Sequence, residues 1–364
     1  MSPFCSATRA SSRRLPAGNR RSPSSRRSGT SWSTGGPASP LRTLITGVAG
    51  FVGRHLAREL AKRPKEELYG ADHVALGYSD SDGDLRAKLK SHRPLDVRDF
   101  GQVAGWVREC RPDRIVHLAA QSSGAESIRD PAGTYLVNAV GTLHLLEAVR
   151  AEAPEAMVLL VGSADVYGTG SPGQKIREDA PMKPMNPYAF SKAAQDSLGE
   201  LYAGTYRLNI VRTRTFSHTG PGQQPRFALA GFADQLARID AGLVAAELRV
   251  GNLEGVRDYG DVRDVVRAYD ALLERGGPGE TYNVCTGRGH VLRDLLEILC
   301  GAAGFKPTIV QDPERMRSRD ADYLVGDPTK LRSKTRWSPD IPIERTLQDL
   351  YTDARERLRR EIGR

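Results

Sequence analysis

The feature that most constrains the fold is a glycine-rich stretch, LRTLITGVAGFVGRHLARELAKR, at residues 41–63. Residues 43–46 predict a short buried strand that runs directly into Gly47, Gly50 and Gly53, spaced G-x-x-G-x-x-G. The residues after them predict a helix with one apolar face. Glycines permit a tight turn and close approach of a ligand, and a helix N-terminus offers amides to phosphate. The stretch therefore predicts the first unit of a Rossmann-type, doubly wound parallel α/β sheet.

We predict that this loop binds the pyrophosphate of a dinucleotide through Gly47, Gly50, Phe51, Val52 and Gly53. The next strand is predicted at 73–78, HVALGY. No acidic residue ends this predicted strand to bind ribose hydroxyls, and no arginine stands before Arg86 to bind a 2′-phosphate. The pattern leaves the choice between NADPH and NADH open, with a slight preference for NADPH.

Two further stretches contribute to the predicted cofactor site. LDVRD at 95–99 places Asp96 where a carboxylate meets the adenine end, and RIVHLAAQ at 114–121 predicts a buried strand that ends in small residues. Small residues let a flat cofactor lie against the backbone, although an ordinary apolar strand followed by a turn explains the second stretch as well. The predicted contacts here are Asp96, Val97, Leu118, Ala119 and Ala120.

The segment TYLVNAVGTLHLLEAVR, at 134–150, predicts an amphipathic helix. Its apolar stripe consists of Leu136, Val140, Leu143, Leu146 and Val149. Asn138 falls off the stripe, so it is either on the surface or at the active-site end of the sheet.

The chemistry-bearing residues come next. The apolar run at 156–162 predicts a strand that delivers Ser163 and Asp165 at its carboxyl end, where open α/β sheets carry their reactive groups. Pro187 begins a helix that places Tyr188 and Lys192 on one face, four residues apart. A nearby ammonium is expected to lower the pKa of the tyrosine towards neutrality, which suits proton transfer. We predict Ser163, Tyr188, Lys192 and Asp165 as the catalytic set, with Tyr188 and Lys192 also contacting the cofactor.

With these motifs the chain resembles the extended short-chain dehydrogenase/reductases that modify nucleotide sugars, over about residues 42–355. The resemblance implies a NAD(P)-binding Rossmann domain at 41–215 that carries the Ser/Tyr/Lys set. It also implies a smaller C-terminal α/β region at 216–355 that mainly binds the sugar nucleotide, with some segments returning to the first domain. Homodimers are implied too, through a helix bundle that includes the Tyr188 helix.

Segments 216–239, 250–299 and 312–347 look similar to GDP-4-keto-6-deoxymannose reductases. This resemblance implies that Arg257 contacts the diphosphate and that Arg317 and Asp320 hold the GDP end. Asn138 and Ser217 complete the implied substrate contacts. The chain departs from the family pattern at three positions: Thr215 and Ser318 stand where proline is usual, and Ser217 replaces an asparagine that reaches the sugar nucleotide.

The resemblance implies an enzyme that uses NADPH or NADH to reduce the C4 ketone of GDP-4-keto-6-deoxy-D-mannose to a GDP-6-deoxyhexose, GDP-D-rhamnose or its C4 epimer, for surface polysaccharide synthesis. One alternative is a GDP-mannose 4,6-dehydratase. Such enzymes use Thr-x-Glu where this chain has Ser163-Ala164-Asp165, whose shorter carboxylate disfavours elimination. Another alternative is a non-catalytic NAD(P)-binding regulator.

Charge and composition limit the partners. Of 53 basic residues seven arginines lie in the first 40 positions, which hold no acidic residue, so 46 basic and 44 acidic residues remain elsewhere. A nearly neutral body argues against nucleic-acid binding by the fold. The first 40 residues are expected to be a disordered basic extension, a transit peptide or the product of a misplaced start. No apolar run is long enough for a bilayer, and the scattered cysteines and histidines have no metal-ligand spacing, so a cytoplasmic protein without a metal is expected.

Overall fold

A seven-stranded parallel sheet organises the chain in the computed structural model, which describes residues 39–76, 80–315 and 322–363, without the side chains of 80–82. The strand order is β3-β2-β1-β4-β5-β6-β11, so the order reverses between β1 and β4 as in a doubly wound sheet. The strands are β1 Leu41–Thr46, β2 Glu66–Asp72, β3 Ser91–Pro94, β4 Arg114–His117, β5 Met157–Ser163, β6 Ile210–Thr215 and β11 Thr281–Val284. The predicted fold class is confirmed.

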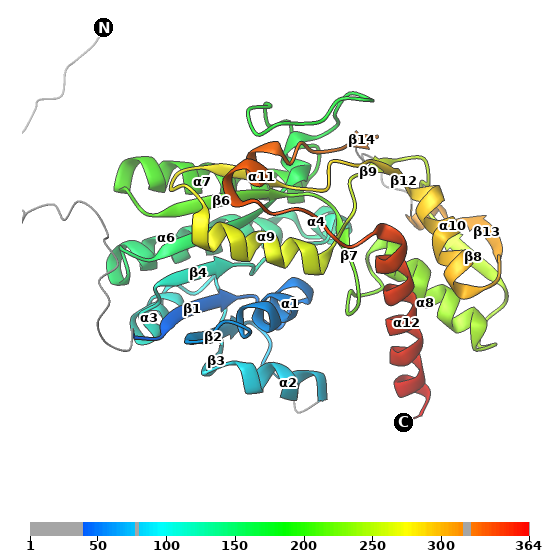
Figure 1. The fold of residues 1–364 in the computed structure, drawn as a ribbon, viewed down its shortest axis with the longest axis horizontal. Coiled ribbons are helices and arrows are strands. Elements are labelled where there is room, and N and C mark those ends of the chain that lie inside the picture. The colour runs from blue at the N-terminus through cyan, green and yellow to red at the C-terminus, as the bar shows by residue number, and fades with distance from the viewer. Residues whose placement is uncertain (1–38, 77–79, 316–321, 364) are drawn as a thin grey trace, which may run out of the picture. The chain divides into compact units, whose positions relative to one another are not determined.

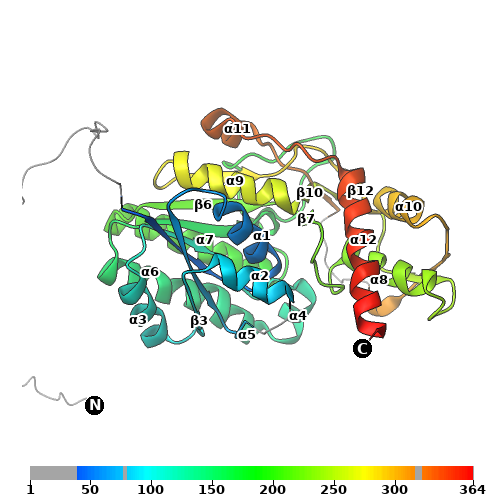
Figure 2. The ribbon, with the colours of Figure 1, turned by 60° about the horizontal axis from the view of Figure 1, so that its bottom comes forward.

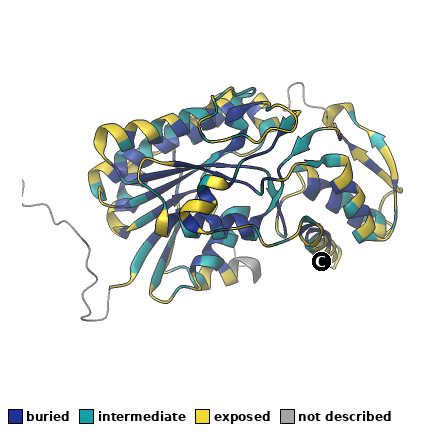
Figure 3. Ribbon diagram, turned by 45° about the horizontal axis from the view of Figure 1, so that its top comes forward, coloured by how far each residue is buried: buried dark blue, intermediate teal, exposed yellow. Residues whose placement is uncertain are grey.

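Helices cover both faces of this sheet because its strands are apolar on both sides. The first face carries α1 Phe51–Leu60, α2 Asp80–Lys88, α9 Val262–Arg275 and α11 Thr329–Thr335. The second face carries α3 Phe100–Cys110, α6 Gly141–Glu152 and α7 Pro187–Tyr206. Along β5, Leu159 packs with the first group, while Val158 and Leu160 pack with the second. Figure 3 shows the strands largely buried and the outer sides of the helices exposed.

Three helices of the C-terminal half form a separate apolar cluster beside the sheet (Figures 1 and 2). They are α8 Ala228–Asp240, α10 Leu292–Ala303 and α12 Ile343–Ile362, with the parallel pair β8 Glu247–Val250 and β13 Thr308–Gln311. The same half returns β11 and α9 to the central sheet and its first face. The assignment of 216–355 to sugar-nucleotide binding stays a prediction.

Short elements connect these parts. On the sheet side they are α4 Gly124–Arg129, α5 Pro131–Tyr135, a π-helical turn at Leu136–Val140 and a 3-10 turn at Ala164–Tyr167, and a second 3-10 turn at Pro313–Arg315 follows β13. The short strands are β7 His218–Thr219, β9 Val256–Arg257, β10 Gly260–Asp261, β12 His290–Val291 and β14 Tyr323–Leu324. They form the pair β10-β7 and the triplet β12-β9-β14. No helix among the described residues has the length and apolar character to cross a membrane.

The second strand differs from the sequence-based prediction. It runs over Glu66–Asp72, whereas residues 73–78 were expected, and Val74 is 52% exposed. Pairing with β1 fixes this position, with Leu41 opposite Glu66 and Thr46 opposite Ala71. The consequence is that an acidic residue, Asp72, does end the strand, contrary to the prediction.

The helix expected at 134–150 is broken into α5, a π-helical turn and α6. A π-helical turn adds one residue and changes which side chains face inward. Leu136 is therefore 46% exposed, while Asn138 is fully buried. The predicted stripe is wrong at Leu136 for this reason.

Candidate active site

The end of β5 and the start of α7 bring three predicted catalytic residues together. Ser163 is the last residue of β5, and its hydroxyl accepts a hydrogen bond from the Asp165 amide at 3.2 Å. The same hydroxyl shares a hydrogen bond with the Tyr188 hydroxyl. Asn186 caps α7 by accepting from the Ala189 amide at 2.9 Å, which fixes where the helix begins and hence where Tyr188 stands.

Lys192 lies one turn further along α7 and is only 4% exposed. Its ammonium donates to the Val161 carbonyl at 3.1 Å and to Gln195 Oε1 at 2.7 Å. Burial lowers the pKa of Lys192 from 10.5 to about 7, because the low dielectric penalises the charged form. A lysine with this pKa titrates near neutrality.

The pKa of Tyr188 moves opposite to the sequence-based expectation. Burial raises it, the Asp165 carboxylate raises it further, and the hydrogen bond from Ser163 only partly opposes them. The expected lowering by Lys192 is not among the causes of this shift, which come from burial, Asp165 and Ser163. Tyr188 is consequently a protonated phenol at neutral pH, ready to act as a proton donor.

The glycine loop has the shape of a dinucleotide cradle. Gly47 has φ of +75°, and a Cβ there would lie 2.7 Å from the Ala119 amide nitrogen. A Cβ on Gly53 would lie 2.3 Å from the Gly47 carbonyl oxygen. The N-terminus of α1 follows Gly50 and has no side-chain cap. Its amides therefore suit a phosphate, and the loop fits a dinucleotide.

Residues at neighbouring strand ends surround this cradle. Leu118 and Ala119 follow β4 and donate from their amides to Thr46, at 3.1 Å to its carbonyl and 3.3 Å to its hydroxyl. Asp72 at the end of β2 accepts from the Ala49 amide at 3.0 Å, so this acid braces the glycine loop. Asp96 follows β3 and pairs with Arg98 at 2.6 Å. The cofactor contacts of Asp96, Val97, Leu118, Ala119 and Ala120 stay predictions.

Asn138 is hydrogen-bonded within the protein. It is fully buried, and its amide group donates to the Gln121 carbonyl at 2.9 Å and to Ser191 Oγ at 2.8 Å. Its Oδ1 accepts from the Gln121 amide at 2.8 Å. With both N–H groups used inside the protein, Asn138 ties the π-helical turn to α7. Its burial excludes the surface alternative, and its predicted contact with the substrate stays a prediction.

The residues predicted to hold the sugar nucleotide come from the second half. Ser217 follows β6, is half-buried, and accepts at its carbonyl from the Gly260 amide at 2.9 Å. Arg257 lies in β9 and donates from Nη1 to the Val256 carbonyl at 3.2 Å. Arg317, Ser318 and Asp320 fall outside the described residues. The substrate contacts of this group stay predictions.

Sequence reasoning missed a series of hydrogen-bonded, buried polar side chains next to the site. His117 bonds the Thr46 hydroxyl at 2.8 Å and the Thr142 hydroxyl at 3.1 Å, and Thr142 donates to the Asn138 carbonyl at 2.7 Å. Burial lowers the pKa of His117 to about 3, so it is neutral. Gln195, which contacts Lys192, was missed as well. A polar residue inside an otherwise apolar strand or helix face is the only signal the sequence offers for either.

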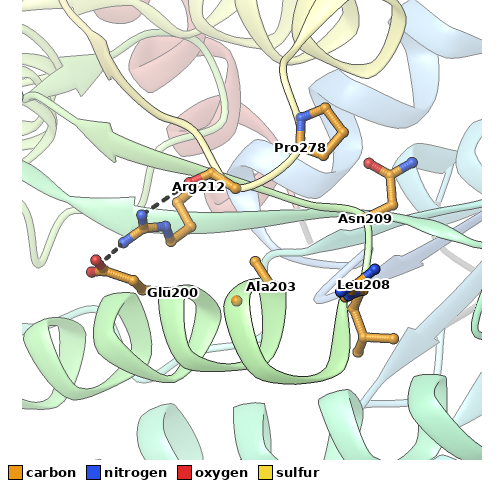
Figure 4. A pocket seen from close by; sticks show the side chains of 9 residues that line it. Glu200, Ala203, Leu208, Asn209, Arg212 and Pro278 are labelled. Carbon is orange, nitrogen blue, oxygen red and sulfur yellow. Dashed lines mark hydrogen bonds and ion pairs between the residues drawn. The ribbon is translucent and has the colours of Figure 1, made fainter.

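A cavity of about 500 Å³ lies away from this site, and Figure 4 shows residues that line it. It is lined by Leu208 and Asn209, which precede β6, whereas Ser163 pairs with Thr215 at the opposite end of that strand. Glu200 and Arg212 form an ion pair at 3.2 Å in its wall. The cavity therefore lies at the amino end of β6, whereas open α/β proteins carry their chemistry at the carboxyl ends of the strands.

A glycine cradle at the end of β1, a serine at the end of β5, and a tyrosine and a lysine on the first turns of α7 define an extended short-chain dehydrogenase/reductase. Within that class the chain belongs to the GDP-mannose 4,6 dehydratase family, whose model matches residues 44–350. The predicted family is confirmed.

Individual relatives cover nearly the whole fold. The GDP-6-deoxy-D-mannose reductase of Pseudomonas aeruginosa is 37% identical over 323 residues, which are 88% of this chain and 99% of that protein. GDP-mannose 4,6 dehydratase 2 of Arabidopsis thaliana is 30% identical over 87% of this chain and 88% of its own length. Among solved structures, RMD from Pseudomonas aeruginosa complexed with NADPH has a TM-score of 0.75 and 34% identity, covering 87% of this chain and 99% of that one.

Proposed function

We propose that this protein reduces the C4 ketone of GDP-4-keto-6-deoxy-D-mannose with NADPH or NADH, giving a GDP-6-deoxyhexose whose expected identity is GDP-D-rhamnose. The observation that carries the proposal is the Ser163–Tyr188 hydrogen bond, with Lys192 one helical turn away, above a glycine cradle. The likeness to a GDP-6-deoxy-D-mannose reductase over 99% of its length supports the same reaction.

The protein's own groups handle the proton and the oxygen. Tyr188 donates its phenolic proton to the oxygen as the ketone becomes an alkoxide, and the Ser163 hydroxyl holds that oxygen in place. The raised pKa of Tyr188 keeps it protonated before the reaction. Lys192, in its ammonium form, stabilises the resulting phenolate and binds the ribose of the cofactor. When bound, NADPH or NADH supplies the hydride to C4.

The glycine loop and the C-terminal half supply the binding contacts. Gly47, Gly50 and Gly53 hold the pyrophosphate of the cofactor at the N-terminus of α1. On the substrate side Arg257 binds the diphosphate, because a guanidinium offers paired donors to phosphate. Arg317 and Asp320 hold the GDP end, and Ser217 contacts the sugar nucleotide with a shorter reach than asparagine.

The reductase is tested with the full-length protein, given NADPH or NADH and GDP-4-keto-6-deoxymannose made in situ. Nicotinamide absorbance should fall, and Tyr188→Phe should abolish the fall because phenylalanine lacks the phenolic proton. Tyr206→Phe is the matched control on the same helix, since Tyr206 is 47% exposed at its far end. Analysis of the product sugar separates GDP-D-rhamnose from its C4 epimer.

A 4,6-dehydratase is the second candidate, since Asp165 lies near enough to Tyr188 to affect its pKa and dehydratases occur among the relatives. A dehydratase regenerates its cofactor, so GDP-mannose would be converted with no net loss of nicotinamide absorbance. If neither substrate reacts with the folded protein, the proposed function is wrong, and cofactor binding without turnover would favour the alternative of a non-catalytic regulator.

We further propose that the enzyme is a cytoplasmic homodimer that supplies surface polysaccharide synthesis. Exposed apolar side chains on neighbouring helices support the dimer. These are Ile128 of α4, Tyr135 of α5, Leu136 of the π-helical turn and Phe190 of α7. Pairing of two such helix faces buries these residues and places the Tyr188 helix in the interface.

A further inference from the structure

Gln195 is a fully enclosed polar residue that the proposed reaction does not use directly. It is 1% exposed and stands three residues after Lys192 on α7. Its Oε1 accepts from Lys192 Nζ at 2.7 Å, and its Nε2 donates to the Val161 carbonyl at 3.2 Å. Lys192 Nζ donates to the same carbonyl at 3.1 Å. Lysine, glutamine and backbone carbonyl thus close a triangle beneath the end of β5.

This triangle restricts the lysine ammonium. An ammonium has three N–H groups in fixed tetrahedral directions. Two of them are taken by Gln195 Oε1 and the Val161 carbonyl, so the third points away from both acceptors. Without Gln195 only one direction would be fixed, and the head group would rotate freely about it.

Gln195 also matters because no described anion compensates the buried charge. Burial is the only cause behind the lowered pKa of Lys192. Asp196, the next residue on α7, is paired with Arg212 at 2.7 Å and Arg214 at 3.0 Å.

The other titratable groups near the Lys192 head do not compensate its charge either. His117 on β4 is neutral, and Tyr188 is a protonated phenol. Asp165 lies beyond them, near the tyrosine. The neutral amide oxygen of Gln195 is therefore the side-chain acceptor that stabilises the ammonium.

We propose that Gln195 is a positioning residue that keeps Lys192 charged and aims its third N–H towards Tyr188 and the cofactor ribose. The inference rests on the proposed function, because it acts through the lysine that serves the tyrosine. A glutamine that only filled space would instead contribute to stability and leave the titration of the lysine unchanged.

The test compares full-length Gln195→Met and Gln195→Glu with the wild type, by measuring kcat and KM for NADPH from pH 6 to 10. Methionine has a similar length but lacks the acceptor. A hydrogen bond to a charged group is worth about tenfold in its protonation equilibrium. The activity of Gln195→Met should therefore fall with rising pH about one pH unit below the pH at which wild-type activity falls. The carboxylate of Gln195→Glu should move the same fall to higher pH and restore kcat.

Gln235→Met is the matched control. Gln235 also makes three hydrogen bonds in a half-buried position, but it ties α8 to β8 through Gly231 and Arg249. The Gln235→Met variant should be less stable than the wild type but should have the same pH profile of activity. If the profiles of the wild type and Gln195→Met superimpose while both proteins are folded and active, the inference is wrong.

A second readout does not depend on turnover. The quenching of protein fluorescence by NADPH gives a Kd at each pH, and weaker binding by Gln195→Met should begin at lower pH than in the wild type. An inactive wild type that binds NADPH with this pH difference would contradict the reductase but keep the inference. An active wild type with no such difference in either assay would contradict the inference alone.

Discussion

At the scale of single residues, the site contains a charge that the fold buries at a cost. Lys192 is 4% exposed, and its neighbours offer a carbonyl and an amide but no paired carboxylate. Burying an unpaired ammonium disfavours the folded state, which is why the pKa of Lys192 drops to about 7. The proposed role of Lys192 would account for this cost, since binding and catalytic groups often reduce stability.

Replacing Lys192 with methionine should therefore stabilise the protein while abolishing reduction. The expected gain in unfolding free energy is on the order of 2 kcal/mol. Its sign follows from the pKa, which is lower in the folded state than in the unfolded one. The gain is full below about pH 7, where wild-type Lys192 is charged in both states, and it disappears as pH rises towards 10.5. Urea unfolding at pH 6 and pH 9.5 measures this, and equal gains at both pH values would contradict it.

The glycine cradle gives a second prediction at this scale. Gly47→Ala forces a side chain into positive φ and against the Ala119 backbone. We therefore expect the unfolding free energy to fall by about 2–4 kcal/mol and cofactor binding to be lost. Gly105→Ala is the control, because a Cβ on this α3 residue has nothing within 4 Å. This variant should gain about 0.5–1 kcal/mol of unfolding free energy. Thermal unfolding of both variants decides the matter. A neutral Gly47→Ala would show that the loop tolerates a side chain.

At the scale of elements, α7 is fastened to β6 by buried charges. Arg212 and Arg214 project from the side of β6 that faces α7, and Asp196 lies between them at 2.7 and 3.0 Å. Thr215 on the opposite side of the strand bonds Tyr269 of α9 at 2.8 Å. Because α7 also carries Tyr188 and Lys192, this ion cluster holds the helix of the proposed catalytic residues against the sheet.

Removing the central carboxylate should be costly. Asp196→Ala leaves two buried guanidinium groups without their shared partner. We therefore expect the unfolding free energy to fall by about 3–5 kcal/mol. Glu200→Ala removes a partner of Arg212 that is 68% exposed, so it should cost less than about 1 kcal/mol. Chemical denaturation compares the two variants. Similar small losses would mean that the cluster is not what holds α7 in place.

At the scale of the whole molecule, the chain leaves the central sheet and returns to it. After β6 it forms β7 and α8, comes back as α9 and β11, and then builds α10 and α12 against α8. Ser217 and Arg257 lie on the segments that leave the sheet, while the glycine cradle lies on it. The proposed substrate and cofactor contacts thus come from different parts of one chain.

The proposed dimer gives the prediction at this scale. Phe190→Asp places a charge among the exposed apolar residues of α4, α5 and α7, so the dimer should dissociate, because a buried unpaired charge disfavours association. Leu243→Asp, at a 50% exposed position after α8, is the control and should remain dimeric. Light scattering after size exclusion measures the mass. A monomeric wild type would rule out the dimer.

Local sequence signals were sufficient for much of the fold and the reactive set. The glycine loop, the strand before Ser163 and the start of α7 at Pro187 were all predicted close to where they lie. Each depends on interactions between near neighbours, such as a tight turn, an apolar run or a helix cap. The position of β2 and the break at Leu136–Val140 were not predicted, because strand pairing and a π-helical turn depend on distant partners.

The sequence by itself therefore determined which residue types stand at the sheet edge: glycines for a phosphate, and a serine, a tyrosine and a lysine for a carbonyl. Only the tertiary structure decided their electrostatics. The strand end at Asp72, the burial of Asn138 and the raised pKa of Tyr188 all arise from groups far apart in the chain. Burial and pairing are properties of the packed molecule. The same Tyr-x-x-x-Lys spacing on an exposed helix would therefore shift neither the pKa of the tyrosine nor that of the lysine.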